Sequence, residues 1–115
     1  MLPLVYLSKT ITNPIYSRAH PDHMTKKDAQ LGRELMIDEL KTTVKYENMA
    51  DQADDKGTAE VIRDVADEEK VHTGEGAAIV AANDKRATPA MKEGLKEASE
   101  HIPSFKEVFD HPEKF

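Results

Sequence analysis

The chain has no cysteine and no tryptophan, and aromatic residues make up only 5% of its 115 residues. Without cysteine it can form no disulfide, no thiolate zinc site, no iron–sulfur cluster and no thiol nucleophile. Basic residues are also in the minority, since 16 lysines and arginines stand against 22 acidic residues, for a net charge of −6. This balance argues against a general nucleic-acid binder, which needs a basic surface. Any unusual chemistry must therefore come from the carboxylates and the five histidines.

Long apolar runs are absent as well. No stretch approaches the roughly 18 consecutive apolar residues that a membrane-spanning helix requires. Residues 1–7 are apolar, but the segment is short, is interrupted by Pro3 and lacks the basic start of a secretion signal. We therefore expect a cytoplasmic protein.

The pattern of apolar residues predicts an all-α protein. Residues 1–24 contain three prolines and show no helical period, so we expect an extended N-terminal arm. A helical domain is predicted over 25–102, followed by a short C-terminal segment, 103–115, with room for one more turn. The predicted helices of the domain span about 26–54, 59–83 and 89–101.

Start and stop signals define these boundaries. Thr25 with Asp28 three residues later resembles a capping box at the start of the first helix. Residues 54–57 predict a turn, after which Thr58 can cap the second helix. Pro89 suits the first turn of the third helix, where its missing N–H is not needed.

Two long helices and a short one make a poor core by themselves. An antiparallel pair of helices buries one stripe of each helix and leaves the other side exposed. Two such hairpins side by side form a four-helix bundle. The predicted fold is therefore an antiparallel hairpin of two long helices plus a shorter C-terminal helix, which dimerises into a four-helix bundle.

Each long helix carries a stripe of residues spaced alternately by three and four, as in helices that face a partner. The stripe of the first helix consists of Leu35, Glu39, Thr42, Tyr46, Met49 and Ala53. The stripe of the second consists of Ile62, Val65, Glu69, His72, Gly76 and Ile79. Ionisable ligand groups interrupt both stripes near the middle, and charged side chains are almost never buried without a partner.

The Glu-x-x-His pair formed by Glu69 and His72 also has an ordinary interpretation. Glu69 could turn outward and form a solvated face with Glu68 and Lys70, and His72 could be a hydrogen-bonded core histidine. A glutamate on the matching stripe, Glu39, favours a ligand cluster over this alternative.

The charges of this cluster indicate what it can bind. One chain offers two carboxylates and one imidazole, too few to neutralise two divalent ions. A two-fold dimer offers four carboxylates and two imidazoles, which match two Fe(II) ions in charge and in ligand type. We therefore predict a metal site shared between subunits, suited to iron or manganese with zinc competing. One zinc ion per chain is a further alternative.

At these residues the chain resembles a known family. The segments 38–40, 46–50 and 64–75 read DEL, YENMA and DVADEEKVHTGE. They resemble the rubrerythrin-like branch of the ferritin superfamily and, more narrowly, the encapsulated ferritins, especially the ferritin-like domains associated with archaeal encapsulins. The likeness spans roughly 30–80. It implies a half-length ferritin-like chain that forms dimers with a di-iron ferroxidase centre at the interface, and rings of such dimers.

The resemblance also assigns roles to residues. It implies that the metal ligands are Glu39, Glu69 and His72, with Tyr46 as a hydrogen-bonding neighbour of the metals, although Tyr46 could equally serve packing alone. Asp38 falls where bacterial members keep a carboxylate of an iron-access site. Three further glutamates, Glu34, Glu47 and Glu75, are candidates to line an iron route, although ordinary exposed helix carboxylates are commoner.

The chain departs from the bacterial members at two positions. Lys41 and Lys45 stand where those proteins carry a carboxylate and a tryptophan, which weakens the case for a matching access site. The C-terminal residues 104–115 do not match the short peptide that usually directs this family into an encapsulin shell. A shell partner is therefore implied by the family and not by this tail. His20 and His23 could bind a surface metal, but a solvated loop is the simpler interpretation.

The expected function is ferroxidase activity, in which Fe(II) is oxidised to Fe(III) by oxygen or peroxide for iron storage or detoxification inside an encapsulin compartment. One alternative is a rubrerythrin-like peroxide reductase, which would need an external electron donor because the chain has no cysteine. The other is a non-enzymatic helical oligomer or cargo module, whose polar cluster only sets the register of the dimer.

Overall fold

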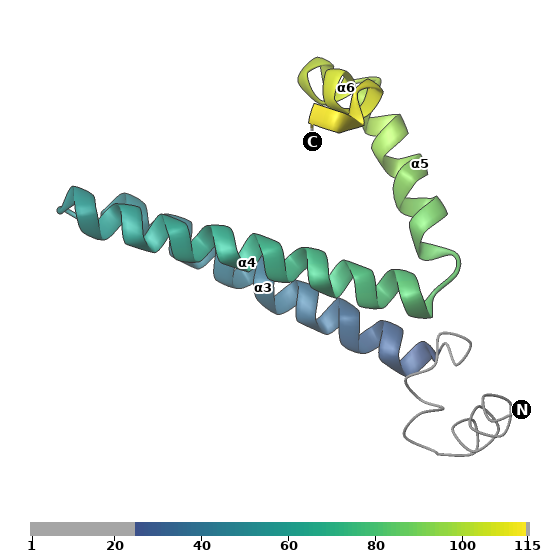
Figure 1. The fold of residues 1–115 in the computed structure, drawn as a ribbon, viewed down its shortest axis with the longest axis horizontal. Helices are drawn as coiled ribbons and strands as arrows, with labels where there is room; N and C mark the ends of the chain where they lie inside the picture. Colours follow the sequence, from purple (N-terminus) through teal and green to yellow (C-terminus); the bar gives the residue numbers. More distant parts are fainter. Residues whose placement is uncertain (1–24, 115) are drawn as a thin grey trace, which may run out of the picture. The chain divides into compact units, whose positions relative to one another are not determined.

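The computed structural model describes residues 25–114, and within them every regular element is helical (Figure 1). The elements are α3 (Lys26–Gln52), α4 (Lys56–Asn83), α5 (Ala87–Ser99), α6 (Pro103–Asp110) and the 3₁₀ turn η1 (Pro112–Lys114). The predicted all-α class is thus confirmed for this part of the chain. The predicted arm over 1–24, with His20 and His23, lies outside the described residues.

The two long helices form an antiparallel hairpin. The backbone N–H of Thr25, at the start of α3, donates to the side-chain oxygen of Asn83, at the end of α4, over 3.4 Å. Figure 1 shows α3 and α4 side by side along their full length. No helix among residues 25–114 is long and apolar enough to cross a membrane.

The predicted start of α3 is confirmed in detail. Thr25 is the N-cap, and its hydroxyl accepts a hydrogen bond of 3.0 Å from the backbone N–H of Asp28. The helix ends at Gln52, two residues earlier than predicted, because Ala53 already has an extended backbone (ψ 131°).

The predicted cap of the second helix is wrong. The carboxylate of Asp55 accepts hydrogen bonds from the backbone N–H of Thr58 at 2.7 Å and from its hydroxyl at 2.8 Å, so Asp55 rather than Thr58 occupies the capping position. These hydrogen bonds lower the pKa of Asp55 because they favour its charged form. As a result, α4 begins at Lys56, three residues before the predicted start, and the connection is shortened to three residues, 53–55.

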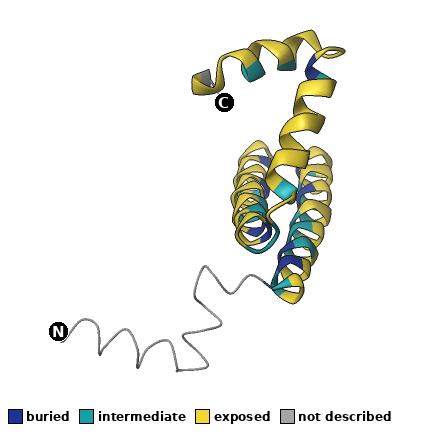
Figure 2. Cartoon of the chain, turned by 90° about the vertical axis from the view of Figure 1, so that its right-hand side faces the viewer, coloured by how far each residue is buried: buried dark blue, intermediate teal, exposed yellow. Residues whose placement is uncertain are grey.

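Small side chains line the contact between α3 and α4. The buried residues of α3 are Ala29, Gly32, Thr43 and Ala50, and those of α4 are Ala59, Ala66, Gly76 and Val80. Figure 2 shows buried residues on the facing sides of the two helices and exposed residues over most of the rest. Because small side chains let backbones approach closely, the contact line is narrow.

This contact line does not coincide with the predicted stripes. Of the twelve stripe residues only Gly76 is buried, whereas Met49, Val65 and Ile79 are exposed and the others are half-buried. Two helices in contact bury a narrower line than the full apolar stripe of each, and the alanines and glycines beside the stripes can come closest. The predicted stripes therefore run along the edge of the contact and onto an open side of the hairpin.

The described residues from 84 onward, 84–114, belong to a second compact unit. Helix α5 begins at Ala87 and ends at Ser99, two residues earlier at each end than predicted. Helix α6 starts with Pro103 in its first turn, and the rings of Phe105 and Phe109 pack 6.1 Å apart between centroids. The unit buries little of its apolar surface, as Met91, Leu95 and Ile102 remain exposed.

Candidate metal centre

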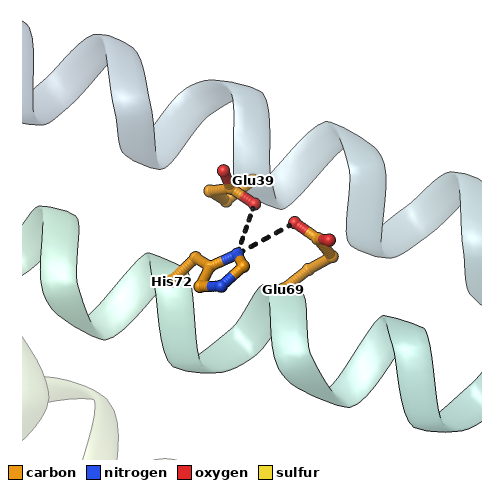
Figure 3. A group of neighbouring side chains, drawn as sticks. All are labelled: Glu39, Glu69 and His72. Carbon is orange, nitrogen blue, oxygen red and sulfur yellow. Dashed lines mark ion pairs between the residues drawn. The ribbon is translucent and has the colours of Figure 1, made fainter.

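Glu39, Glu69 and His72 come together between the two long helices (Figure 3). Glu39 projects from α3, while Glu69 and His72 lie three residues apart on α4, a spacing that places them on the same side one turn apart. One ligand atom from each of the three lies within 4.8 Å of the others. Among the described residues this is the one group of three or more acidic or histidine side chains with such a geometry. We call these three residues the carboxylate–histidine cluster.

The cluster is enclosed on its carboxylate side and open on its histidine side. The side chains of Glu39 and Glu69 are only 17% and 16% exposed, whereas that of His72 is 45% exposed. Nδ1 of His72 lies 3.5 Å from an Oε2 atom of each glutamate. This distance is long for a hydrogen bond, so the three groups surround a shared position without closing on one another.

One oxygen of the cluster is an unsatisfied acceptor. With both carboxylates ionised, Oε2 of Glu39 is buried and accepts no hydrogen bond from any residue that the structure describes. A buried carboxylate oxygen without a donor is costly to desolvate. A cation bound among the three side chains would satisfy it, which is the observation in this structure that fits a metal.

Crowding of the two carboxylates shifts the protonation of Glu39. Hydrogen-bonding contact with Glu69 raises the pKa of Glu39, because the pair is held best when one carboxyl keeps its proton. Burial and the negative charge of Glu69 raise the pKa of Glu39 further, and His72 offsets only part of the rise.

The histidine responds to the same neighbours. Burial by itself would lower the pKa of His72, but the polar contact with Glu69 and the negative charges of both carboxylates outweigh it. The pKa of His72 is therefore raised overall. Without a cation, the cluster holds protons more tightly than isolated side chains would.

Neighbouring hydroxyls are already engaged by the helices. Thr43 donates to the backbone carbonyl of Glu39 at 2.8 Å, and Thr73 donates to that of Glu69 at 3.0 Å. Thr42 likewise donates to the carbonyl of Asp38 at 2.8 Å. Among residues 25–114, the acidic and histidine ligands that one chain brings together here are the two carboxylates and the imidazole.

The remaining predicted site residues do not join the cluster in a single chain. Tyr46 is half-buried and seven residues beyond Glu39, and among the described residues it makes no hydrogen bond to the three ligands. Its role beside a metal stays a prediction. Asp38, Glu34 and Glu75 are exposed, as expected for helix carboxylates and equally for an access route.

Glu47 belongs to a network of ion pairs on the surface of the hairpin. Its carboxylate pairs with Nζ of Lys70 at 3.3 Å, and Lys70 also pairs with Asp67 at 2.9 Å. These ion pairs raise the pKa of Lys70, the Asp67 contact most of all. The side chains of these ion pairs line a polar groove of about 450 Å³. The other residues that line it are Asn48, Asp51, Arg63 and Ala66. Glu47 is thus exposed, as expected for a helix carboxylate, and its part in an iron route stays a prediction.

Compared with known proteins, the chain matches no family model, no curated protein and no solved structure. The likeness to encapsulated ferritins therefore stays a hypothesis based on motifs. In the structure of this chain, the three side chains predicted to be ligands do converge.

Proposed function

We propose that this chain is one half of a ferroxidase, whose di-iron centre forms between two copies. The observation that carries the proposal is the carboxylate–histidine cluster. Its two carboxylates are half-buried, the pKa of Glu39 is raised, and Oε2 of Glu39 lacks a hydrogen-bond donor. Perturbed ionisable groups that gather at one place are typical of functional sites.

The cluster lies beside an open apolar face that a second copy can cover. Val65, His72 and Ile79 are each seven residues apart on α4 and therefore share one side of that helix. On α3, Leu35, Thr42 and Met49 follow the same spacing. We call these six residues the open face.

The residues of the open face on α3 and those on α4 lie on the same side of the hairpin. Thr42 and Met49 each immediately precede a buried contact residue of α3, as Val65 and Ile79 do on α4. In two antiparallel helices, corresponding positions beside the contact line fall on the same side of the hairpin. Apolar side chains exposed around half-buried ionisable groups favour an interface over a solvated surface.

Charge balance favours a second copy of this chain as the occupant. Doubling the cluster gives four carboxylates and two imidazoles, a set of charge −4 that balances two divalent ions. Carboxylate and imidazole ligands suit Fe(II) and Mn(II), and the lack of cysteine removes the ligand that most favours zinc. The same doubling without metal would bring four carboxylates together, which is unfavourable.

Each residue of the cluster has a role in this proposed reaction. Bound iron supplies the redox chemistry, since two Fe(II) ions each lose one electron while O₂ gains two electrons and two protons and becomes hydrogen peroxide. Glu39 and Glu69 hold the cations and stabilise the higher charge of the oxidised state. His72 completes the set of ligands as a neutral donor, and Tyr46 is proposed to hydrogen-bond to these ligands.

Storage of the oxidised iron requires a further partner. A hairpin with a contact line of small residues cannot enclose a mineral cavity. On the family hypothesis, dimers assemble into rings inside an encapsulin shell in the cytoplasm. We propose that shell as the compartment in which iron is deposited.

Oxidant stoichiometry distinguishes ferroxidase from peroxide reductase. We expect the purified chain to oxidise Fe(II) with O₂ many-fold faster than buffer alone, with about two Fe(II) consumed per O₂. Stopped-flow absorbance with an oxygen electrode measures both quantities. Rapid turnover of H₂O₂ that needs an added donor, with no acceleration by O₂, would favour the rubrerythrin-like alternative.

Metal binding is expected to depend on pH through the cluster. The folded pKa values of Glu39 and His72 are raised, so these groups stabilise the metal-free fold below their unfolded pKa values. That stabilisation is lost as the pH rises through the folded pKa values. Metal ions compete with the same protons, so metal binding strengthens as the pH rises.

We therefore expect the rise in Tm on adding Mn²⁺ to increase between pH 6 and pH 8, as measured by circular dichroism. Mn²⁺ is chosen because it takes the same ligands as Fe(II) without rapid oxidation. The His72→Gln variant is the control. Its response should be smaller and should change less with pH, because only the proton on the Glu39–Glu69 pair then competes with the metal. A Tm rise that is equal at both pH values in the wild type would contradict the assignment.

A further inference from the structure

Two glycines, Gly32 of α3 and Gly76 of α4, bring the backbones of the two helices into close contact near the cluster. A Cβ atom added to Gly76 would lie 2.7 Å from Cγ of Met36 and 3.2 Å from the carbonyl oxygen of Gly32. A Cβ added to Gly32 would lie 3.0 Å from γ-methyl groups of Ile79 and Val80, and 3.1 Å from the carbonyl oxygen of Gly76. A side chain at either glycine would therefore have to displace atoms of the other helix.

This contact lies next to the ligand residues along α4. Gly76 follows His72 by four residues, which is about one helical turn. Glycine weakens a helix relative to alanine, so its presence in the middle of α4 needs a reason. Gly74 in the same helix shows no such reason, because nothing lies within 4 Å of a Cβ added there.

We propose that Gly76, packed against Gly32 and Met36, is a positioning residue that sets the separation of α3 and α4 at which Glu39 meets Glu69 and His72. The inference rests on the proposed metal function of these three side chains. Ordinary contacts of a Cβ atom begin at about 3.4 Å, so a methyl group at position 76 would displace Met36 or the helix by several tenths of an ångström. Metal–ligand distances tolerate only about 0.2 Å, so a shift of this size matters more for binding than for folding.

The test compares Mn²⁺ binding by the full chain with Gly76→Ala or with Gly74→Ala. Both variants add one methyl group to α4, but only the first meets the other helix. We expect Gly76→Ala to bind Mn²⁺ about tenfold or more weakly by isothermal titration calorimetry, at a temperature where far-ultraviolet circular dichroism shows it fully folded. Gly74→Ala should bind like the wild type.

A rescue variant separates positioning from a general loss of stability. Met36→Ala removes the atom nearest to the added methyl group, so Met36→Ala/Gly76→Ala should recover most of the lost affinity. If Gly76→Ala does not fold, Gly32→Ala takes its place, because its added Cβ meets the ends of two side chains as well as a carbonyl oxygen. Folded Gly32→Ala is then expected to show the same loss of affinity.

The outcomes distinguish this inference from the function on which it rests. Wild-type affinity in a folded Gly76→Ala chain, or in the folded Gly32→Ala replacement, would overturn the positioning role while leaving the metal site standing. Failure of the double variant to recover any affinity would also count against it. Absence of Mn²⁺ binding by both the wild type and Gly74→Ala would instead overturn the proposed metal function.

Discussion

Replacing Glu39 by glutamine is expected to reduce Fe(II) oxidation to the rate of buffer alone. The change keeps the shape of the side chain but removes one negative charge per chain, so the ligand set of a dimer falls from −4 to −2 against two divalent ions. It also leaves an amide beside the imidazole of His72, where a carboxylate oxygen now lies 3.5 Å away. We expect metal affinity to fall at least 100-fold by calorimetry.

The same variant has a second signature that a loss of folding would not produce. Glu39 carries a raised pKa because Glu69 crowds it, so removing its charge relieves repulsion in the metal-free chain. Metal-free Glu39→Gln should therefore be at least as stable as the wild type at pH 8, while its Tm no longer responds to metal. Glu60→Gln, an exposed glutamate of α4, is the matched control. Wild-type rates of Fe(II) oxidation in Glu39→Gln would show that the ligands have been misassigned.

Placing a lysine at Val65 is expected to separate the dimer and to remove its metal. Val65 is 42% exposed in the single chain. It lies on the open face, on the same side of α4 as His72. In a two-fold interface the change would take two ammonium groups out of water, and removing these charges from water costs several kcal/mol. The dimer dissociation constant should rise about 100-fold or more, and bound metal should be lost with it.

A matched substitution outside the open face tests whether this effect is specific. Val44 is 59% exposed on α3 and stands five residues from Glu39, well around the helix from the open face. Val44→Lys should leave both the dimer and its metal content intact. Lysine suits both positions because an ammonium group is not an iron ligand at neutral pH. Sedimentation equilibrium gives the dissociation constants, and dimers of wild-type affinity in Val65→Lys would place the interface elsewhere.

The convergence of the ligands could be predicted from the sequence because helical spacing is regular. Glu69 and His72 had to share one side of their helix, and an antiparallel partner of similar length had to bring the middle of α3 beside them. Glu39 was the one ionisable ligand on the matching stripe. The structure confirms that these three side chains meet.

The line of contact between the helices could not be predicted from apolar periodicity alone. Leu35, Met49 and Val65 read as core residues, yet the hairpin closes on alanine, glycine and threonine beside them. A pattern of large apolar residues indicates what must eventually be covered, but it does not say whether the same chain or a second copy covers it. Glycine in a helix interior was the available signal for the close contact at Gly32.

Local polar contacts account for the other differences. Asp55 and not Thr58 takes the capping position. Its carboxylate accepts two hydrogen bonds, from the backbone N–H and from the hydroxyl of Thr58. The ion pair between Glu47 and Lys70 joins two helices, so it depends on how α3 and α4 are rotated against each other. Rotation of this kind is decided by packing and is not visible in the spacing of charges.

Metal content per chain, measured together with particle mass, shows whether two copies of the chain share one metal centre. After purification with Fe(II) under anaerobic conditions, size-exclusion chromatography with light scattering and elemental analysis should show about one iron per chain in dimers or larger rings. Monomers isolated by dilution or from Val65→Lys should hold almost none. One iron per chain in stable monomers, or dimers without iron, would contradict a metal centre shared between two copies of this chain.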